Sequence, residues 1–188
     1  IRRPPRNRPT PLLVAIVGGS GSGNSRMAQR LQRALGRQAA RLSLDDFHRE
    51  RTRLSPARRA RLNFDHPRAI DWPELQRVLH QLLAGRPTRV PCYDFVTHSR
   101  RRASRLLAPK PVILLEGLWL LRRPALRRQL AWSLFLRCPA RTRLARRLAR
   151  DVLARGRTPA SVREQFQAMV EPMHRRFVAP QARWARSE

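Results

Sequence analysis

Lysine, cysteine and long apolar runs are all scarce in this chain of 188 residues. Lys110 is the single lysine among 41 basic residues, so arginine provides almost all of the positive charge. No apolar run approaches the roughly 20 residues that a membrane-spanning helix needs, and no secretory signal peptide is visible. The two cysteines, Cys92 and Cys138, lie in unrelated contexts without the spacing of a metal site. We therefore expect no membrane partner, and we expect a cytoplasmic protein with reduced thiols.

Acidic residues are also few, with 12 against the 41 basic ones, and the formal net charge is +29. Such a charge commonly indicates a polyanionic partner such as nucleic acid. Here the arginines are spread over every segment, form no tail and are not accompanied by an aromatic-rich ribbon. We interpret them as a compositional bias in which a minority bind phosphates. We expect no specific nucleic acid partner, and we expect only non-specific adhesion of the protein to nucleic acid at low salt.

The remaining composition is that of one folded domain. Hydrophobic residues make up 41% of the chain, which is sufficient for an ordinary core. A chain of this length buries roughly two-thirds of its unfolded surface. We predict a flexible segment rich in proline and arginine over residues 1–11, followed by a single domain over residues 12–188.

The most informative stretch is residues 12–32. Its first six residues have the length and β-branched content of a buried parallel strand. A glycine-rich turn over residues 18–23 follows, and then a helical pattern that ends near Gly36. Glycines let a phosphate approach backbone N–H groups closely, and a helix N-terminus favours negative charge. This stretch therefore predicts an anion site.

The spacing of this turn is that of the phosphate-binding loop G-x-x-x-x-G-K-[ST], with one departure. Gly18, Gly23 and Ser25 fit the pattern, but Asn24 replaces the lysine. The lysine normally reaches the β- and γ-phosphates, and asparagine is both shorter and neutral. Asn24 therefore raises the question of whether the chain transfers phosphate or only binds nucleotide.

Carboxylates follow two of the expected strands. Asp45 and Asp46 come after a short strand over residues 39–44, and Glu116 follows a buried strand over residues 112–115. Ligands bind at the carboxyl ends of strands in open α/β sheets. For the aspartates a helix N-cap or turn is the alternative interpretation. Glu116, beside a phosphate loop, is well placed to bind Mg²⁺ directly or through water.

Three later segments are expected to be helical. Asp71 is predicted to cap a helix that Gly85 closes, and Thr158 marks the start of the last helix. Between them, residues 141–155 form one basic helix with apolar residues at i, i+4 and i+8 and arginines around the rest. A solvated basic face is one interpretation of it, and a lid that lays arginines over phosphates is the other. A further strand is expected over residues 132–136.

The chain resembles the uridine/cytidine kinase family of phosphate-loop kinases from about Leu12 to Pro180. The resemblance rests on motifs in the family's order: GGSGSGNS, LSLDDFHR, NFDHPRAID, PCYDFVTHSR, ILLEGLWLL and RTRLARRLARDVLARGRT. It implies a P-loop NTPase fold of the α/β class, with three α/β/α layers, a parallel sheet of about five strands and a helical lid near residues 141–160. The family's last core strand follows the position where this chain stops, so the sheet is expected to lack an edge strand. The resemblance also implies ATP and Mg²⁺ as cofactors, a nucleoside as the small-molecule partner, and a homo-oligomer as one possible assembly.

The resemblance assigns the acceptor half of the site residue by residue. Asp45 matches the base that accepts the proton of the nucleoside 5′-hydroxyl, and Asp65 matches the carboxylate that holds the ribose hydroxyls. Arg147 is expected nearest the ribose. The other matching positions form the nucleoside pocket: Phe64, Tyr93, Phe95, His98, Gln165 and His48, which stands where the family commonly has tyrosine.

The donor half is assigned in the same way. Arg150 and Arg155 match catalytic lid arginines, and Ser25 and Glu116 match the Mg²⁺ site. The positions expected to contact the nucleotide are Gly18, Ser20, Gly21, Ser22, Gly23, Asn24, Ser25, Arg26 and Arg157. Arg26 lies two positions beyond the missing lysine and points elsewhere, so a lid arginine is the better candidate for replacing its charge.

Several functions remain open at this point. The leading hypothesis is ATP-dependent phosphorylation of uridine or cytidine at the ribose 5′-hydroxyl. A pseudokinase that binds without transferring phosphate is the second hypothesis, and Asn24 alone motivates it. Asn24 could equally be an engineered change in an active parent. A nucleic-acid-binding protein and a related kinase with another acceptor, such as a sugar phosphate or pantothenate, are the remaining alternatives.

Overall fold

The computed structural model of this chain describes residues 10–60 and 62–187. Most of the predicted N-terminal segment, residues 1–9, lies outside the described residues. Across the part that is described, no helix is both long and apolar enough to cross a membrane, and both cysteines are free.

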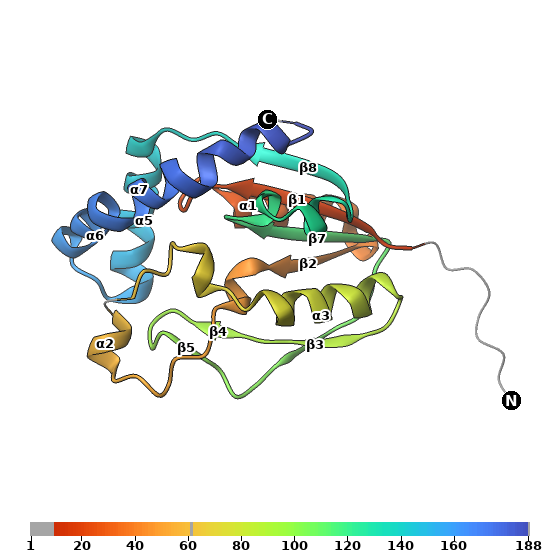
Figure 1. Cartoon of the computed structure of the whole chain (residues 1–188), viewed down its shortest axis with the longest axis horizontal. Helices are drawn as coiled ribbons and strands as arrows, with labels where there is room; N and C mark the ends of the chain where they lie inside the picture. Colours follow the sequence, from red (N-terminus) through yellow and green to blue (C-terminus); the bar gives the residue numbers. More distant parts are fainter. Residues whose placement is uncertain (1–9, 61, 188) are drawn as a thin grey trace, which may run out of the picture.

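The centre of the fold is a parallel sheet of four strands in the order β2-β7-β1-β8 (Figure 1). The strands are β1 (Leu12–Gly18), β2 (Ala39–Ser43), β7 (Val112–Gly117) and β8 (Leu130–Leu136). The sequence predicts each of them to within two residues. Against the expected five strands, the outer edge of β8 has only an isolated parallel bridge between Leu134 and Ser187. That bridge lies where a fifth strand would pair.

Helices cover both faces of this sheet, which confirms the predicted α/β/α layers (Figure 1). On one face Ile16 and Leu114 pack with Ala28 of α1 (Asn24–Leu35). On the other face the larger core includes Leu75 and Leu79 of α3 (Trp72–Leu83). It also includes Val178 and Ala182 of residues 166–184, which we call the C-terminal helical segment. The remaining helices are α2 (Pro56–Ala60), α4 (Pro124–Arg127), α5 (Ala140–Arg155), α6 (Pro159–Gln165) and α7 (Glu171–Met173).

Two small antiparallel ribbons lie beyond the sheet. One pairs β3 (Thr88–Val90) with β6 (Arg105–Leu107), and the other pairs β4 (Tyr93–Asp94) with β5 (Ser99–Arg100). Residues 93–100 therefore form a hairpin. Its tip includes His98, the one described non-glycine residue with positive φ, at 51°.

The predicted caps of two helices are confirmed. The Oδ1 atom of Asp71 accepts a hydrogen bond from the backbone N–H of Glu74 at 3.2 Å, which satisfies a free donor at the start of α3. The hydroxyl of Thr158 accepts one from the N–H of Ser161 at 3.2 Å at the start of α6. Both bonds fix where these helices begin.

Helix α5 buries part of its basic face, which disagrees with a wholly solvated basic face and leaves the lid interpretation open. Its buried residues are Arg143, Arg147 and Asp151, at i, i+4 and i+8, while Leu144 and Leu148 are only partly buried. The reason is that α5 packs over the phosphate loop rather than over the apolar core. There Nε of Arg143 donates a hydrogen bond to the backbone oxygen of Cys138 at 3.2 Å, and Arg147 forms an ion pair with Asp151 at 3.5 Å.

Candidate active site

A cleft of about 260 Å³ opens at the carboxyl ends of the central strands. It is lined by Ser20, Asp45, His48, Phe64, Asp65, Phe95, Val96, His98, Leu118, Trp119, Arg147, Arg150, Arg155, Arg157 and Gln165. All of these except Val96, Leu118 and Trp119 are predicted from sequence. The structure thus brings together residues from the phosphate loop, the acidic turn after β2, the hairpin and the lid. Their chemical roles stay predictions.

The phosphate loop is closely packed, and its glycines are needed for that packing. Gly21 and Gly23 have φ of 84° and 105°, a region that side chains disfavour. A Cβ on Gly21 would lie 2.6 Å from the backbone oxygen of Arg143, and one on Gly19 would lie 2.6 Å from Nδ1 of His174. The loop therefore fits beneath α5 and the C-terminal helical segment only because it has no side chains at these points.

Asn24 is turned back into this loop. Its Nδ2 donates a hydrogen bond to the backbone oxygen of Gly18 at 2.9 Å, and its Oδ1 accepts one from Oγ of Ser22 at 2.9 Å. The side chain is 7% exposed and does not line the cleft. Asn24 therefore closes the loop on itself and presents no positive charge to a phosphate.

Arginines of the lid contact the loop directly. Nη1 of Arg147 donates to Oγ of Ser20 at 2.6 Å, and its Nη2 donates to Oε1 of Gln165 at 3.0 Å. Nη1 of Arg146 donates to the backbone oxygen of Ser22 at 3.0 Å. Arg146 was not among the predicted residues, because a sequence shows the face of a helix but not what covers it.

Sequence reasoning also missed Asp151. It is fully buried, and its carboxylate pairs with Arg150 at 2.7 Å, Arg155 at 3.3 Å and Arg147 at 3.5 Å. Burial alone would raise the pKa of Asp151, but the hydrogen bond and charge of Arg150, with the charges of the other two, hold it below its usual range. A carboxylate at i+4 from Arg147 and i−4 from Arg155 was the available signal.

We expect Asp151→Asn to lower the free energy of unfolding by about 3 kcal/mol, because it leaves buried guanidinium groups without a counter-charge. The matched control is Glu74→Gln, which breaks the exposed pair with Arg77 at 2.7 Å and should change stability by less than about 1 kcal/mol. Because the folded pKa of Asp151 is depressed, its contribution is present above the unfolded value of about 3.9 and is lost as pH falls below it. Urea unfolding between pH 3 and pH 7 measures both effects, and equal losses in the two variants would contradict this account.

Aromatic rings form the acceptor end of the cleft. His48 is 4% exposed and lies 5.0 Å from Tyr93, 5.6 Å from Phe64 and 5.8 Å from Phe95, measured between ring centroids. Burial lowers the pKa of His48, so the ring is neutral at neutral pH. The rings of Phe64 and His98 stack at 4.5 Å. The cleft can therefore enclose a flat, uncharged ring.

Tyr93 is the one predicted aromatic residue that does not line the cleft. It is 6% exposed, and its ring lies behind His48, so it supports the pocket wall instead of forming it. Burial raises the pKa of its hydroxyl to about 12. Arg26 also lies outside the cleft, because it is exposed on the outer side of α1.

The predicted metal-site residues contact each other. Oγ of Ser25 donates to Oε1 of Glu116 at 3.0 Å, and Arg41 also reaches that oxygen at 3.2 Å. Burial, followed by the nearby charge of Asp45, raises the pKa of Glu116 to about 7. The charge of Arg41 lowers this pKa, but its effect is smaller than that of burial. A hydroxyl and a buried carboxylate are hard oxygen ligands that fit Mg²⁺. Within the described residues there is no group of three or more His, Cys, Asp or Glu side chains that could hold a metal ion.

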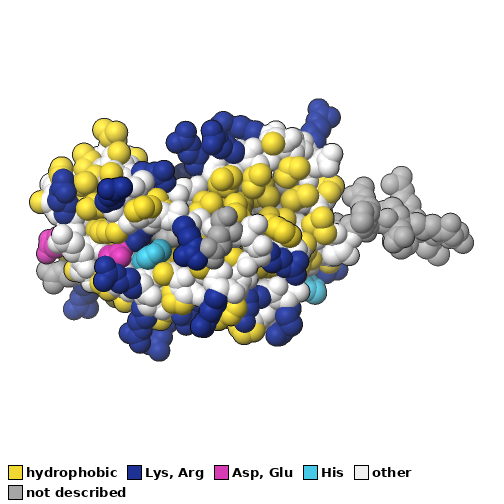
Figure 2. All heavy atoms as spheres, turned by 90° about the horizontal axis from the view of Figure 1, so that it is seen from above, with side chains coloured by type: hydrophobic (Ala, Val, Ile, Leu, Met, Phe, Trp, Pro, Cys, Tyr) yellow, Lys and Arg dark blue, Asp and Glu magenta, His cyan; other side chains and the backbone are white. Residues whose placement is uncertain are grey.

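Many arginines outside the cleft lie on the surface of the molecule. On the face seen in Figure 2, basic side chains are spread over the surface, with few acidic ones between them and apolar side chains exposed among them. The distribution agrees with the compositional bias inferred from the sequence.

Comparison with known proteins adds independent information. Residues 13–186 match the model of the phosphoribulokinase/uridine kinase family. The chain is 40% identical over 176 residues to a uridine kinase of Chloroflexus aurantiacus, which covers 93% of this chain and 84% of that protein. It is 38% identical to a uridine kinase of Deinococcus deserti, with 93% and 85% covered. A solved structure of phosphoribulokinase from Rhodobacter spheroides superposes with a TM-score of 0.69 at 16% identity, over 94% of this chain and 68% of that one, which supports the fold alone.

Proposed function

This chain belongs to the phosphoribulokinase/uridine kinase family, and from that membership we propose that it transfers the γ-phosphoryl group of ATP to the ribose 5′-hydroxyl of a pyrimidine nucleoside. The observation that supports this most is that one cleft contains the phosphate-loop residue Ser20, the carboxylates Asp45 and Asp65, and the lid arginines. In this proposal the donor site and the acceptor site are adjacent. The identity to proteins named uridine kinase supports a nucleoside as the acceptor.

In the proposed acceptor site, Asp65 binds the ribose diol, because two carboxylate oxygens can accept two vicinal hydroxyls. Burial raises the pKa of Asp65, and the charge of Arg147 opposes that rise. A ribose in this position would place its 5′-hydroxyl toward the phosphate loop. Asp45, which lines the same cleft, accepts the proton of that hydroxyl as it attacks phosphorus.

In the proposed donor site, backbone N–H groups of the loop and the start of α1 hold the phosphates. Arg150 and Arg155 neutralise the charge that develops on the transferred group, and their joint ion pairs to Asp151 keep them oriented beforehand. Ser25 and Glu116 would hold Mg²⁺, which would neutralise part of the negative charge of the phosphates.

A second candidate function is nucleotide binding without transfer. The observation that favours it is the position of Asn24, whose amide is engaged within the loop and offers the phosphates no charge. Loss of one charge-assisted contact removes roughly 1.5–3 kcal/mol. We place transfer first because the acceptor residues Asp45, Asp65 and His98 all lie in the cleft, and a protein that only bound nucleotide would not need them there.

The test of the proposed function is ADP formation that depends on uridine or cytidine. We expect turnover with either nucleoside, and a KM for nucleoside about tenfold or more higher in Asp65→Asn, since one charge-assisted contact to the diol is lost. Asp94→Asn is the control, because Asp94 is an aspartate of the neighbouring hairpin that does not line the cleft. An equal rate of ADP formation with and without nucleoside would contradict the proposal.

A further inference from the structure

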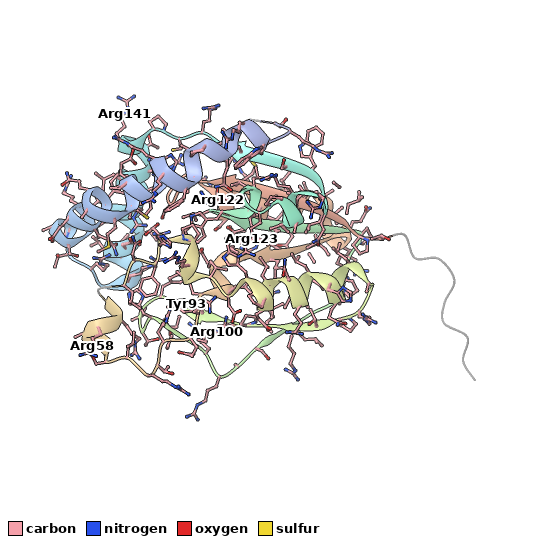
Figure 3. All side chains as sticks on the ribbon, viewed as in Figure 1. Arg58, Tyr93, Arg100, Arg122, Arg123 and Arg141 are labelled. Atoms are coloured by element: carbon pink, nitrogen blue, oxygen red, sulfur yellow. The ribbon has the colours of Figure 1, made fainter. Side chains whose placement is uncertain are left out.

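A second concave site lies outside the catalytic cleft. It has a volume of about 540 Å³ and is lined by Arg49, Arg51, Pro67, Arg68, Trp72, Trp119, Arg122 and Arg123. Figure 3 shows two of these, Arg122 and Arg123, in the space between α3 and the C-terminal helical segment. No residue of the phosphate loop contributes to it, and Trp119 is the one lining residue that it shares with the catalytic cleft. Five of its eight lining residues are arginines and none is acidic.

Two of these arginines are held in place by aromatic rings. The guanidinium carbon of Arg123 lies 4.3 Å from the ring centroid of Trp72, and that of Arg122 lies 4.7 Å from the ring centroid of Phe177. Trp72 is itself fixed by a hydrogen bond from Nε1 to the backbone oxygen of Pro67 at 2.9 Å. A stacked guanidinium is restrained through its face, while its N–H edge stays free to bind an anion.

The charge of the pocket is not neutralised within the described part of the chain. None of its five arginines forms an ion pair with a carboxylate there, in contrast to the lid arginines and their shared Asp151. The positive charge of the pocket also acts on the nearby His66. Burial lowers the pKa of its ring, and the charges of Arg68, Arg176 and Arg122 lower that pKa further. Guanidinium groups held close together without counter-ions attract a multiply charged anion.

We propose that this pocket binds a small oligophosphate, such as the phosphate chain of a nucleotide, at a site separate from the phosphate loop. Its volume is that of a small-molecule site, and its arginines come from two segments of the chain, residues 49–68 and residues 122–123. Several guanidinium groups favour linked phosphates over a single one. Trp72 and Trp119 are 6% and 1% exposed, so neither ring is free to stack on bases, which disfavours single-stranded nucleic acid.

This site does not depend on the proposed kinase activity, because none of the residues assigned to catalysis lines it. Its test is therefore binding, measured by equilibrium dialysis of tripolyphosphate against the whole protein. We expect two sites per chain in the parent protein, the phosphate loop and the arginine pocket. Arg122→Gln/Arg123→Gln should weaken one of them by at least about tenfold and leave the other unchanged.

The control is Arg58→Gln/Arg141→Gln, which removes the same charge from two exposed arginines that lie away from the pocket (Figure 3). It should keep both sites. Arg49→Gln/Arg51→Gln changes two lining arginines from another segment of the chain. It should remove the same site as Arg122→Gln/Arg123→Gln, and agreement between the two variants argues against a folding defect as the cause. Three results would each overturn the proposal. The first is a single tripolyphosphate site in the parent protein, and the second is equally weakened binding in the control variant. The third is tighter binding of a single-stranded oligoribonucleotide than of tripolyphosphate, if that binding depends on these arginines.

Discussion

Asp45→Asn is expected to reduce kcat for nucleoside phosphorylation by about 10²–10⁴-fold, the range that a positioned general base contributes. Asp45 lines the cleft at the end of β2, beside the phosphate loop, where an acceptor hydroxyl would lie. Asparagine has nearly the same shape and can still accept a hydrogen bond, but it cannot take up the proton. The KM for ATP should therefore change little, and the loss should appear in kcat.

The next residue provides a matched control for this prediction. Asp46 is a carboxyl on the same 3-10 turn, Leu44–Phe47, but it does not line the cleft, and burial raises its pKa. Asp46→Asn should therefore retain activity within about tenfold. If both variants lost activity equally, the turn would matter as a structural element and Asp45 would not be the base.

Asn24→Lys is expected to raise kcat by about 10²–10³-fold, because it returns a positive charge to the phosphates in the transition state. The present side chain bonds to Gly18 and Ser22, so its replacement also removes two hydrogen bonds from the loop. Asn24→Ala removes those bonds without adding charge, and comparison of the two variants separates the contributions. We expect Asn24→Ala to lower the rate or leave it unchanged.

An unchanged rate in Asn24→Lys would have a specific meaning. It would show that the lid arginines already supply the charge, and Arg147, which contacts Ser20 at 2.6 Å, is the nearest candidate among them. A lower rate would show that the bonds made by Asn24 are needed to shape the loop. Single-turnover measurements with ATP and uridine distinguish these results, since they report the chemical step without product release.

Much of the fold could be predicted because local patterns agree with global packing. The apolar strand before Gly18, the cap at Asp71 and the stop near Gly36 all follow from periodicity and turn chemistry, and the structure confirms each. The cleft residues were predicted through motifs of the family. The prediction that they share one cavity therefore depends on the resemblance, because their spacing in the sequence does not indicate it. Asp65 and Gln165, for example, are far apart in sequence, yet both line the cleft.

The features that the sequence did not predict concern what lies opposite a residue, which a single sequence does not show. The burial of Asp151 and of the arginine face of α5 depends on the loop beneath them, and an amphipathic pattern favours the apolar face instead. The position of Tyr93 behind His48 depends on how the hairpin packs. The hydrogen bonds of Asn24 depend on the loop conformation, because the same amide could have pointed outward.

The central claim is that this chain phosphorylates a pyrimidine nucleoside at its 5′-hydroxyl, and the most direct measurement is identification of the product. The purified protein is incubated with ATP, Mg²⁺ and uridine, and the nucleotide that forms is analysed by ³¹P NMR and mass spectrometry. We predict uridine 5′-monophosphate in equal amount to ADP, with none above background in Asp45→Asn. ADP without a phosphorylated nucleoside, or the same product yield from Asp45→Asn, would contradict the account.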